Sequence, residues 1–155
     1  MGRLKELRKY VDQELEKMSN PEERTRAVAH LYGVSLAAAI LAKKRGLDPE
    51  LASMSATLHD LSAYKSGSYE DHAHKSAELA RDILGTLELT NAEETDIICS
   101  AIFHHDDKDV VDGPMDELLK DADVIHHCMN DVSKAVKEKE KARYESLCHE
   151  LGLAQ

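Results

Sequence analysis

The chain has 155 residues, which fits one domain with a hydrophobic core and is too short for two ordinary domains. Hydrophobic residues make up 42% and charged residues 32%, a balance that excludes a disordered chain and favours helices. The net charge of -10 argues against binding of nucleic acid or anionic lipid, because both need clustered Lys and Arg. Any phosphate group would therefore be neutralised locally, and metal ions can supply that charge.

The first third of the chain predicts three helices with clear start signals. Apolar residues recur at three- and four-residue steps in the first of them. Asn20-Pro21-Glu22-Glu23 and Asp48-Pro49-Glu50 both place a cap, a proline and early acids in the order that opens a helix. Gly46 is a stop signal between them. We expect these helices over residues 4–19, 21–45 and 48–60.

The rest of the chain predicts four more helices. Residues 62–69 contain Ser, Gly and two Tyr without helical periodicity, so we expect a mobile, lid-like loop there. Thr90-Asn91-Ala92-Glu93 matches a capping box, and residues 106–114 form an acidic turn. The helices are expected over 70–87, 90–105, 115–136 and 137–151. No segment alternates with period two, so the predicted fold class is all-α, a compact multi-helix bundle.

The cysteines and the apolar segments predict a cytoplasmic protein without membrane contact. Cys99, Cys128 and Cys148 are odd in number and form no Cys-x-x-Cys pair, which favours reduced, buried thiols. The basic N-terminal segment is not followed by an apolar region. The longest apolar run, residues 36–42, is too short to span a bilayer.

The histidines are informative because of their positions on the predicted helices. His30 lies on the apolar stripe of the second helix, so its ring should face the core. A satisfied core histidine is the commoner explanation for one such residue. His59 and Asp60 are adjacent at the end of the third helix, where an imidazole and a carboxylate can converge on one ion.

Periodicity also chooses between two histidines of the fourth helix. His72 shares a face with apolar residues and is the better ligand candidate, whereas His74 shares a face with charged residues and should be solvated. His104 and His105 end the fifth helix and both continue apolar faces. Either or both of this pair could therefore enter the same pocket.

Two acids lie at the edges of the apolar stripe of the sixth helix. Burying a lone carboxylate is unfavourable, so a cation near Asp121 or Asp123 would offset that cost. Periodicity does not separate the two. His126 and His127 lie one turn further on and are expected at the surface or as outer partners of the ligands.

The order His, His-Asp, His, His-His, Asp resembles the HD-domain superfamily of metal-dependent phosphohydrolases. The family pattern of a first His, a His-Asp pair and a late Asp is matched by His30, His59-Asp60 and Asp123. Asp123 is chosen over Asp121 because the acid of the family follows an Ala. The resemblance covers residues 26–132. It implies one HD-type domain over residues 1–155, with flanking helices over 1–20 and 133–151.

The resemblance also implies a metal centre, because some members of the family add histidines that hold a second ion. In the implied arrangement Asp60 bridges two ions. The first is held by His30, His59, Asp60 and Asp123, and the second by His72 and His104, with His105 as a further candidate. Imidazole and carboxylate ligands suit Fe, Mn, Co, Ni or Zn, and Mg is also compatible. The expected cofactor is one or two divalent ions per chain.

The implied activity is hydrolysis of a phosphoester or phosphoanhydride bond of a small metabolite, with a nucleotide as the expected substrate, by a metal-activated water. Asp60 is the catalytic candidate as the bridging ligand. Lys65, in the predicted loop, is the nearest basic residue for a phosphate, although an ordinary solvated lysine is the commoner explanation for such a residue. The alternative is a non-catalytic, metal-containing domain that senses a ligand. A homodimer is compatible with either function.

Overall fold

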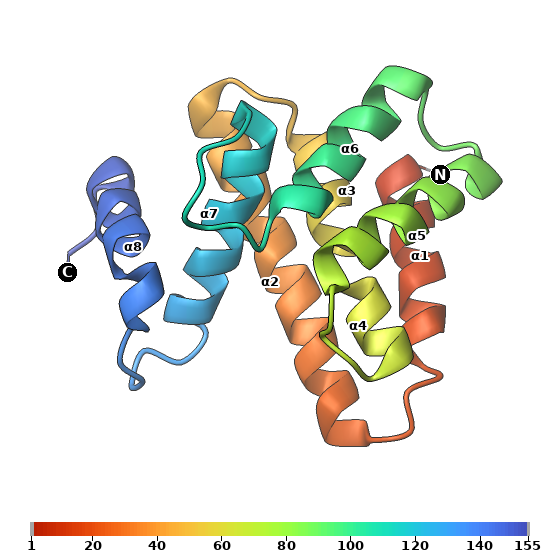
Figure 1. Cartoon of the computed structure of the whole chain (residues 1–155), viewed down its shortest axis with the longest axis horizontal. Helices are drawn as coiled ribbons and strands as arrows, with labels where there is room; N and C mark the ends of the chain where they lie inside the picture. The colour runs from red at the N-terminus through yellow and green to blue at the C-terminus, as the bar shows by residue number, and fades with distance from the viewer. Residues whose placement is uncertain (1, 155) are drawn as a thin grey trace.

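The computed structural model of the protein describes residues 2–154, and the regular elements of this range are all α-helices (Figure 1). This result confirms the predicted all-α class. The helices are α1 (Arg3–Leu15), α2 (Pro21–Arg45), α3 (Pro49–Leu58), α4 (Leu61–Ser66), α5 (His72–Leu87), α6 (Ala92–His104), α7 (Pro114–Met129) and α8 (Glu138–Leu151).

The helix starts follow the capping signals of the sequence. The side chains of Asn20 and Asp48 accept hydrogen bonds from the first backbone N–H groups of α2 and α3. The capping box of α6 lies one residue later than predicted. Its partners are Asn91 and Glu94, which exchange hydrogen bonds of 2.8 and 3.0 Å, while Thr90 bonds Thr95 instead.

Three expectations about helix positions are wrong. The first helix was expected to reach residue 19 but ends at Leu15. The predicted loop at residues 62–69 begins with α4, because Leu61 and Ala63 are buried against the core and Gly67 then closes the helix with a φ of +75°. The sixth helix was expected to reach Val136 but ends at Met129. Beyond that point Asp131 accepts hydrogen bonds from Ser133 and forms a turn.

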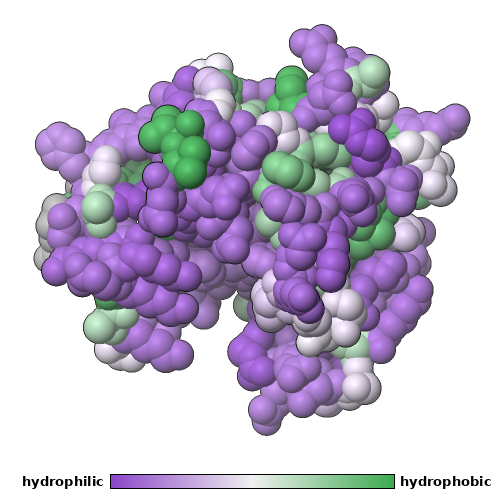
Figure 2. All heavy atoms as spheres, viewed as in Figure 1, coloured by the Kyte–Doolittle hydropathy of each residue, from purple (hydrophilic) through white to green (hydrophobic). Residues whose placement is uncertain are grey.

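Helix α2 is the centre of the bundle and packs mainly against α3 and α7 (Figure 1). Its length and composition meet the criteria for a membrane-crossing helix. Here, however, one face of α2, including Leu31, Val34 and Leu41, is buried in the core. The face of the molecule in Figure 2 is mainly hydrophilic with small hydrophobic patches, as expected for a chain with a net charge of -10.

The segment between α6 and α7 is held by a buried lysine. Lys120 of α7 is fully buried, and its amine donates 2.7 Å hydrogen bonds to the carbonyl oxygen of Val110 and to Asp112. It also pairs with Glu117 at 2.8 Å. Burial opposes a charge on this amine, but the two carboxylates raise its pKa. The lysine therefore stays charged and fixes the segment that carries His105 and Lys108.

Candidate metal centre

Side chains from five parts of the chain meet at one buried cluster, which we call the metal centre. Helix α2 contributes a histidine, the junction of α3 and α4 contributes a histidine and an aspartate, and α5, the end of α6 and α7 contribute one residue each. The members are His30, His59, Asp60, His72, His105 and Asp123. The cluster includes six of the seven metal ligands expected from the sequence.

The junction of α3 and α4 places the His-Asp pair. His59 is the C-cap of α3, directly after the last helical residue Leu58, and at Asp60 the backbone turns (φ -114°, ψ 8°) before α4 begins. Asp60 Oδ2 lies 3.1 Å from Nε2 of His30 and 3.3 Å from Nε2 of His59. The two adjacent residues thus face the same point.

The other oxygen of Asp60 faces a different pair of imidazoles. Asp60 Oδ1 lies 3.2 Å from Nε2 of His105 and 3.4 Å from Nε2 of His72. Each oxygen of this one carboxylate is therefore surrounded by its own two histidines. This is the arrangement expected of a carboxylate between two ions.

Three of the histidines are fixed in the tautomer that a metal ligand needs. The Nδ1 atoms of His59, His72 and His105 each lie 2.6–3.0 Å from the backbone carbonyl oxygen three residues earlier. A carbonyl only accepts, so each Nδ1 carries a proton. When these rings are neutral, the lone pair is on Nε2, which faces the cluster.

His30 obtains the same orientation from another histidine. Its Nδ1 lies 2.9 Å from Nδ1 of His126, which can accept a hydrogen bond from the Nδ1–H of His30 when His30 offers its Nε2 lone pair to the centre. Burial lowers the pKa of His126 to about 4, so this ring stays neutral and able to accept. The ring fits only because residue 33 is Gly: a Cβ there would lie 2.2 Å from Cδ2 of His126.

The late acid of the centre is Asp123, and Asp121 has a different role. Asp123 Oδ1 lies 3.2 Å from Nε2 of His30, and its Oδ2 accepts a 2.8 Å hydrogen bond from Lys108. Asp121 instead pairs with Arg45 at 2.7 Å and with Arg143 at 2.9 Å, on the side of α7 that faces α8. The geometry thus distinguishes two acids that periodicity did not.

The electrostatics of the centre favour a cation. Asp60 Oδ1 and Asp123 Oδ1 are buried side-chain oxygens without a hydrogen-bond partner. Burial opposes their charge, but the surrounding imidazoles, His59 among them, hold the pKa of both carboxyls well below its usual range. Burial also opposes a charge on His59, yet the two carboxylates raise its pKa to about 10. A divalent ion would compete with this proton, and the nitrogen and oxygen donors fit such an ion.

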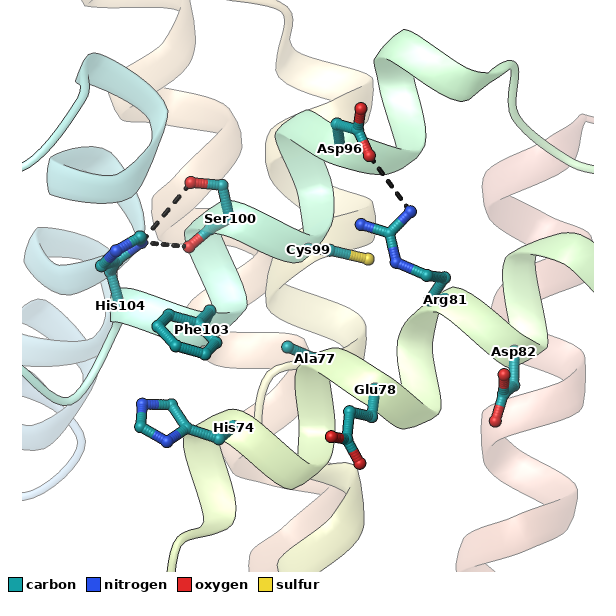
Figure 3. A pocket seen from close by; sticks show the side chains of 10 residues that line it. All are labelled: His74, Ala77, Glu78, Arg81, Asp82, Asp96, Cys99, Ser100, Phe103 and His104. Atoms are coloured by element: carbon teal, nitrogen blue, oxygen red, sulfur yellow. Dashed lines mark hydrogen bonds and ion pairs between the residues drawn. The ribbon is translucent and has the colours of Figure 1, made fainter.

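Two sequence-predicted site residues lie elsewhere. His104 donates from Nδ1 to the carbonyl oxygen of Ser100 (2.8 Å) and lines a pocket of about 680 Å³ between α5 and α6, beside His74 and Phe103 (Figure 3). Lys65 pairs with Glu14 of α1 at 3.3 Å. The structure therefore brings neither His104 nor Lys65 to the metal centre.

Two residues in contact with the metal centre carry little signal in the sequence. Lys108 follows a helix end in an acidic segment, and no spacing rule identifies it as the partner of Asp123. His127 lies 3.4 Å from Asp123 Oδ1 through Nε2. Its position four residues after Asp123 on one helix is a signal that could have found it.

Helices that gather imidazoles and carboxylates around one buried point define a class of helical metalloproteins. Residues 27–128 of the chain match the family model of the HD domain. The match covers more than half of the 155 residues, so the chain belongs to the HD domain family, whose members bind divalent metal ions and include hydrolases. The suspected family is thereby confirmed.

A solved structure gives the same fold. It is described as the crystal structure of a predicted HD superfamily hydrolase from an uncultured Thermotogales bacterium. The similarity has a TM-score of 0.70 and 19% sequence identity, and it covers 97% of this chain and 90% of the other. A search of curated protein sequences found no match.

Proposed function

We propose that this protein is a metal-dependent phosphohydrolase that acts on a small phosphorylated metabolite, with a nucleotide as the first candidate. The observation that carries the proposal is the position of Asp60, whose two buried oxygens each face a separate pair of imidazoles. A structural metal would need one closed set of ligands, whereas this arrangement has two adjacent sets. Two adjacent ions are a recurring device for phosphoryl transfer.

The residues of the centre have distinct tasks in this proposal. Asp60 would hold both ions, with His30, His59 and Asp123 on one side and His72 and His105 on the other. When bound, divalent ions supply an acidified water and neutralise phosphate oxygens. The cofactor would be Fe, Mn, Co, Ni or Zn, since the donors are imidazole nitrogens and carboxylate oxygens without a thiolate. Mg remains compatible with the carboxylates.

Lys108 replaces Lys65 as the cation proposed to meet the substrate. Its amine lies 2.8 Å from Asp123 Oδ2, and its side chain is 12% exposed to solvent. A lysine at the edge of the cluster can contact a phosphate oxygen without leaving its carboxylate partner. Lys65, by contrast, is engaged by Glu14 of α1.

A nucleotide is favoured by an aromatic side chain at the rim. Tyr69 is 59% exposed, and its ring centroid lies 5.3 Å from that of His72. An exposed ring beside a metal ligand offers a face on which a base can stack while its phosphates reach the centre.

We place the activity in the cytoplasm. Cys99, Cys128 and Cys148 are free and buried, which suits a reducing compartment.

The test combines metal content with phosphate release. The protein is stripped of metal, reloaded with Mn, Fe, Co, Ni or Mg, and assayed against a panel of nucleotides and sugar phosphates. We expect selective release by the wild type and none by Asp60→Asn, which keeps the shape of the side chain but removes its charge. Bound metal without turnover on any compound would instead favour the sensing domain.

A further inference from the structure

His127 has the geometry of a metal ligand although the HD pattern has no histidine at this position. Its Nε2 lies 3.4 Å from Asp123 Oδ1. The donor atoms of His30, Asp123 and His127 all lie within 4.8 Å of one another, as ligands of one ion must. The rings of His30 and His127 are stacked, with centroids 5.4 Å apart and planes inclined by 9°. The donor group therefore extends the centre toward α8.

A buried carboxylate stands behind His127. Glu140, in the first turn of α8, is 2% exposed, and its Oε2 lies 2.8 Å from Nδ1 of His127. The carboxylate accepts, so Nδ1 carries the proton and a neutral ring has its lone pair on Nε2. That lone pair faces Asp123 Oδ1, a buried oxygen without a hydrogen-bond partner. An imidazole backed by a carboxylate is a common arrangement of metal-binding histidines.

Helix α8 is fixed in the position that this contact needs. Arg143, one turn after Glu140, pairs with Asp121 at 2.9 Å and donates to the carbonyl oxygen of Lys108 at 3.0 Å. Glu150, near the other end of α8, pairs with Arg45 of α2 at 2.8 Å. The helix is thus tied to both α2 and α7, and the Glu140 carboxylate is held against the imidazole.

We propose that His127, oriented by Glu140, is a further ligand of the metal centre and forms with His30 and Asp123 a binding position on the α8 side. This inference rests on the proposed metal centre and deepens it, because it gives α8 a part in metal binding. The position would add a donor beside Asp123, where Lys108 and the substrate phosphate are placed. The rival role is an imidazolium that bridges the carboxylates of Asp123 and Glu140 without binding metal.

The test is a titration of the metal-stripped protein with Co²⁺, followed by its visible absorption, which reports the number and type of ligands. We expect His127→Ala to weaken one Co²⁺ position by about 10–100-fold and to change the spectrum. Glu140→Gln, which keeps the shape of the side chain, should weaken the same position by about 10-fold. The control His149→Ala changes an exposed histidine of α8 and should titrate like the wild type.

Circular dichroism and thermal unfolding of the stripped variants show whether each one is folded. Variants that fold and bind Co²⁺ like the wild type would overturn the ligand role. If His127→Ala binds Co²⁺ like the wild type but its stripped form unfolds at a lower temperature than the stripped wild type, the imidazolium bridge is the role of His127. A wild-type protein that binds no Co²⁺ at all would overturn the metal centre itself and this position with it. The failure of the phosphohydrolase assay changes neither reading, because the titration involves no substrate.

Discussion

At the scale of single residues, Gly33 has no side chain and so leaves room for the ring that positions the metal ligand His30. A Cβ at this point of α2 would meet the His126 ring, which orients His30. We expect Gly33→Ala to displace that ring and to weaken metal binding by about 10-fold, the size of effect found for outer partners of metal ligands. Isothermal titration with Mn²⁺ measures the change.

A second helical glycine supplies the matched control. Nothing lies within 4 Å of a Cβ built on Gly85 of α5. Gly85→Ala should therefore leave metal affinity unchanged and raise the free energy of unfolding by about 0.5–1 kcal/mol, because Ala is the better helix former. Equal affinity in both alanine variants would show that His126 does not orient His30.

The two acids of α7 give another prediction. Asp123→Asn should lose metal, since it removes the charge of a buried donor in the centre. Asp121→Asn should retain metal but lower the free energy of unfolding by about 1–3 kcal/mol, because it weakens charged hydrogen bonds to Arg45 and Arg143. Metal analysis and urea unfolding separate the two effects. If Asp121→Asn lost metal and Asp123→Asn kept it, Asp121 rather than Asp123 would be the metal ligand.

The sequence could place those ligands that lie on a helix face or match a family pattern. His30 and His72 follow from helical periodicity, and the His59-Asp60 pair follows from resemblance. His104 and His105 could not be separated in this way, because both continue apolar faces of α6. The distinction depends on the last turn: His105 caps the helix and turns its ring inward, whereas His104 bonds Ser100. Such a change of direction has no periodic signal.

At the scale of elements, the helices with strong caps were predictable and the short ones were not. Helices α2 and α3 begin at the residues that their caps indicate. Helix α4 has only six residues, too few for a periodic pattern, and it exists because tertiary burial of Leu61 and Ala63 compensates for weak local propensity. The early end of α7 depends on a turn at Asp131, a local side-chain effect that apolar spacing does not report.

Helix α2 also carries an exposed apolar stripe that bears on self-association, with which the sequence is compatible. Val28, Tyr32, Leu36 and Ile40 recur at four-residue steps, and Leu36 is 66% exposed. The first turn of α2 is acidic and its last turn is basic. An antiparallel second copy would bury the stripe and place opposite charges together. We expect Leu36→Glu to reduce self-association, measured by light scattering, while metal content stays unchanged; a wild-type monomer at all concentrations would exclude the pairing.

At the scale of the whole molecule, the metal centre links stability to pH. The carboxylates of Asp60 and Asp123 raise the pKa of His59 to about 10 despite burial. The ion pairs between protonated His59 and these carboxylates therefore stabilise the metal-free protein, and their contribution is complete at pH values below about 6.5, the pKa of a histidine in the unfolded chain. The contribution declines as pH rises through about 10. Metal binding needs the unprotonated ring, so metal affinity rises over the same range. The stabilisation by metal should therefore grow with pH.

Differential scanning calorimetry at about pH 6 and about pH 8 checks this prediction. With free Mn²⁺ fixed at about 100 times its dissociation constant at pH 6, and kept at that concentration at pH 8, the added stability at pH 6 is about 2.7 kcal/mol, or about 5–10 °C in Tm for a chain of this size. The increment in Tm should be larger at the higher pH. An increment that shrank with pH would mean that the metal does not replace protons on these imidazoles.

The spread of the centre along the chain has a consequence for biosynthesis. Its residues run from His30 to Asp123, and the carboxylate behind His127 follows at Glu140. A growing chain on the ribosome thus lacks Asp123 and His127 until α7 has been made, although the other donors precede this helix. Loading of the complete centre must then follow synthesis of α7, so the ion is chosen by the folded helices rather than by a nascent segment.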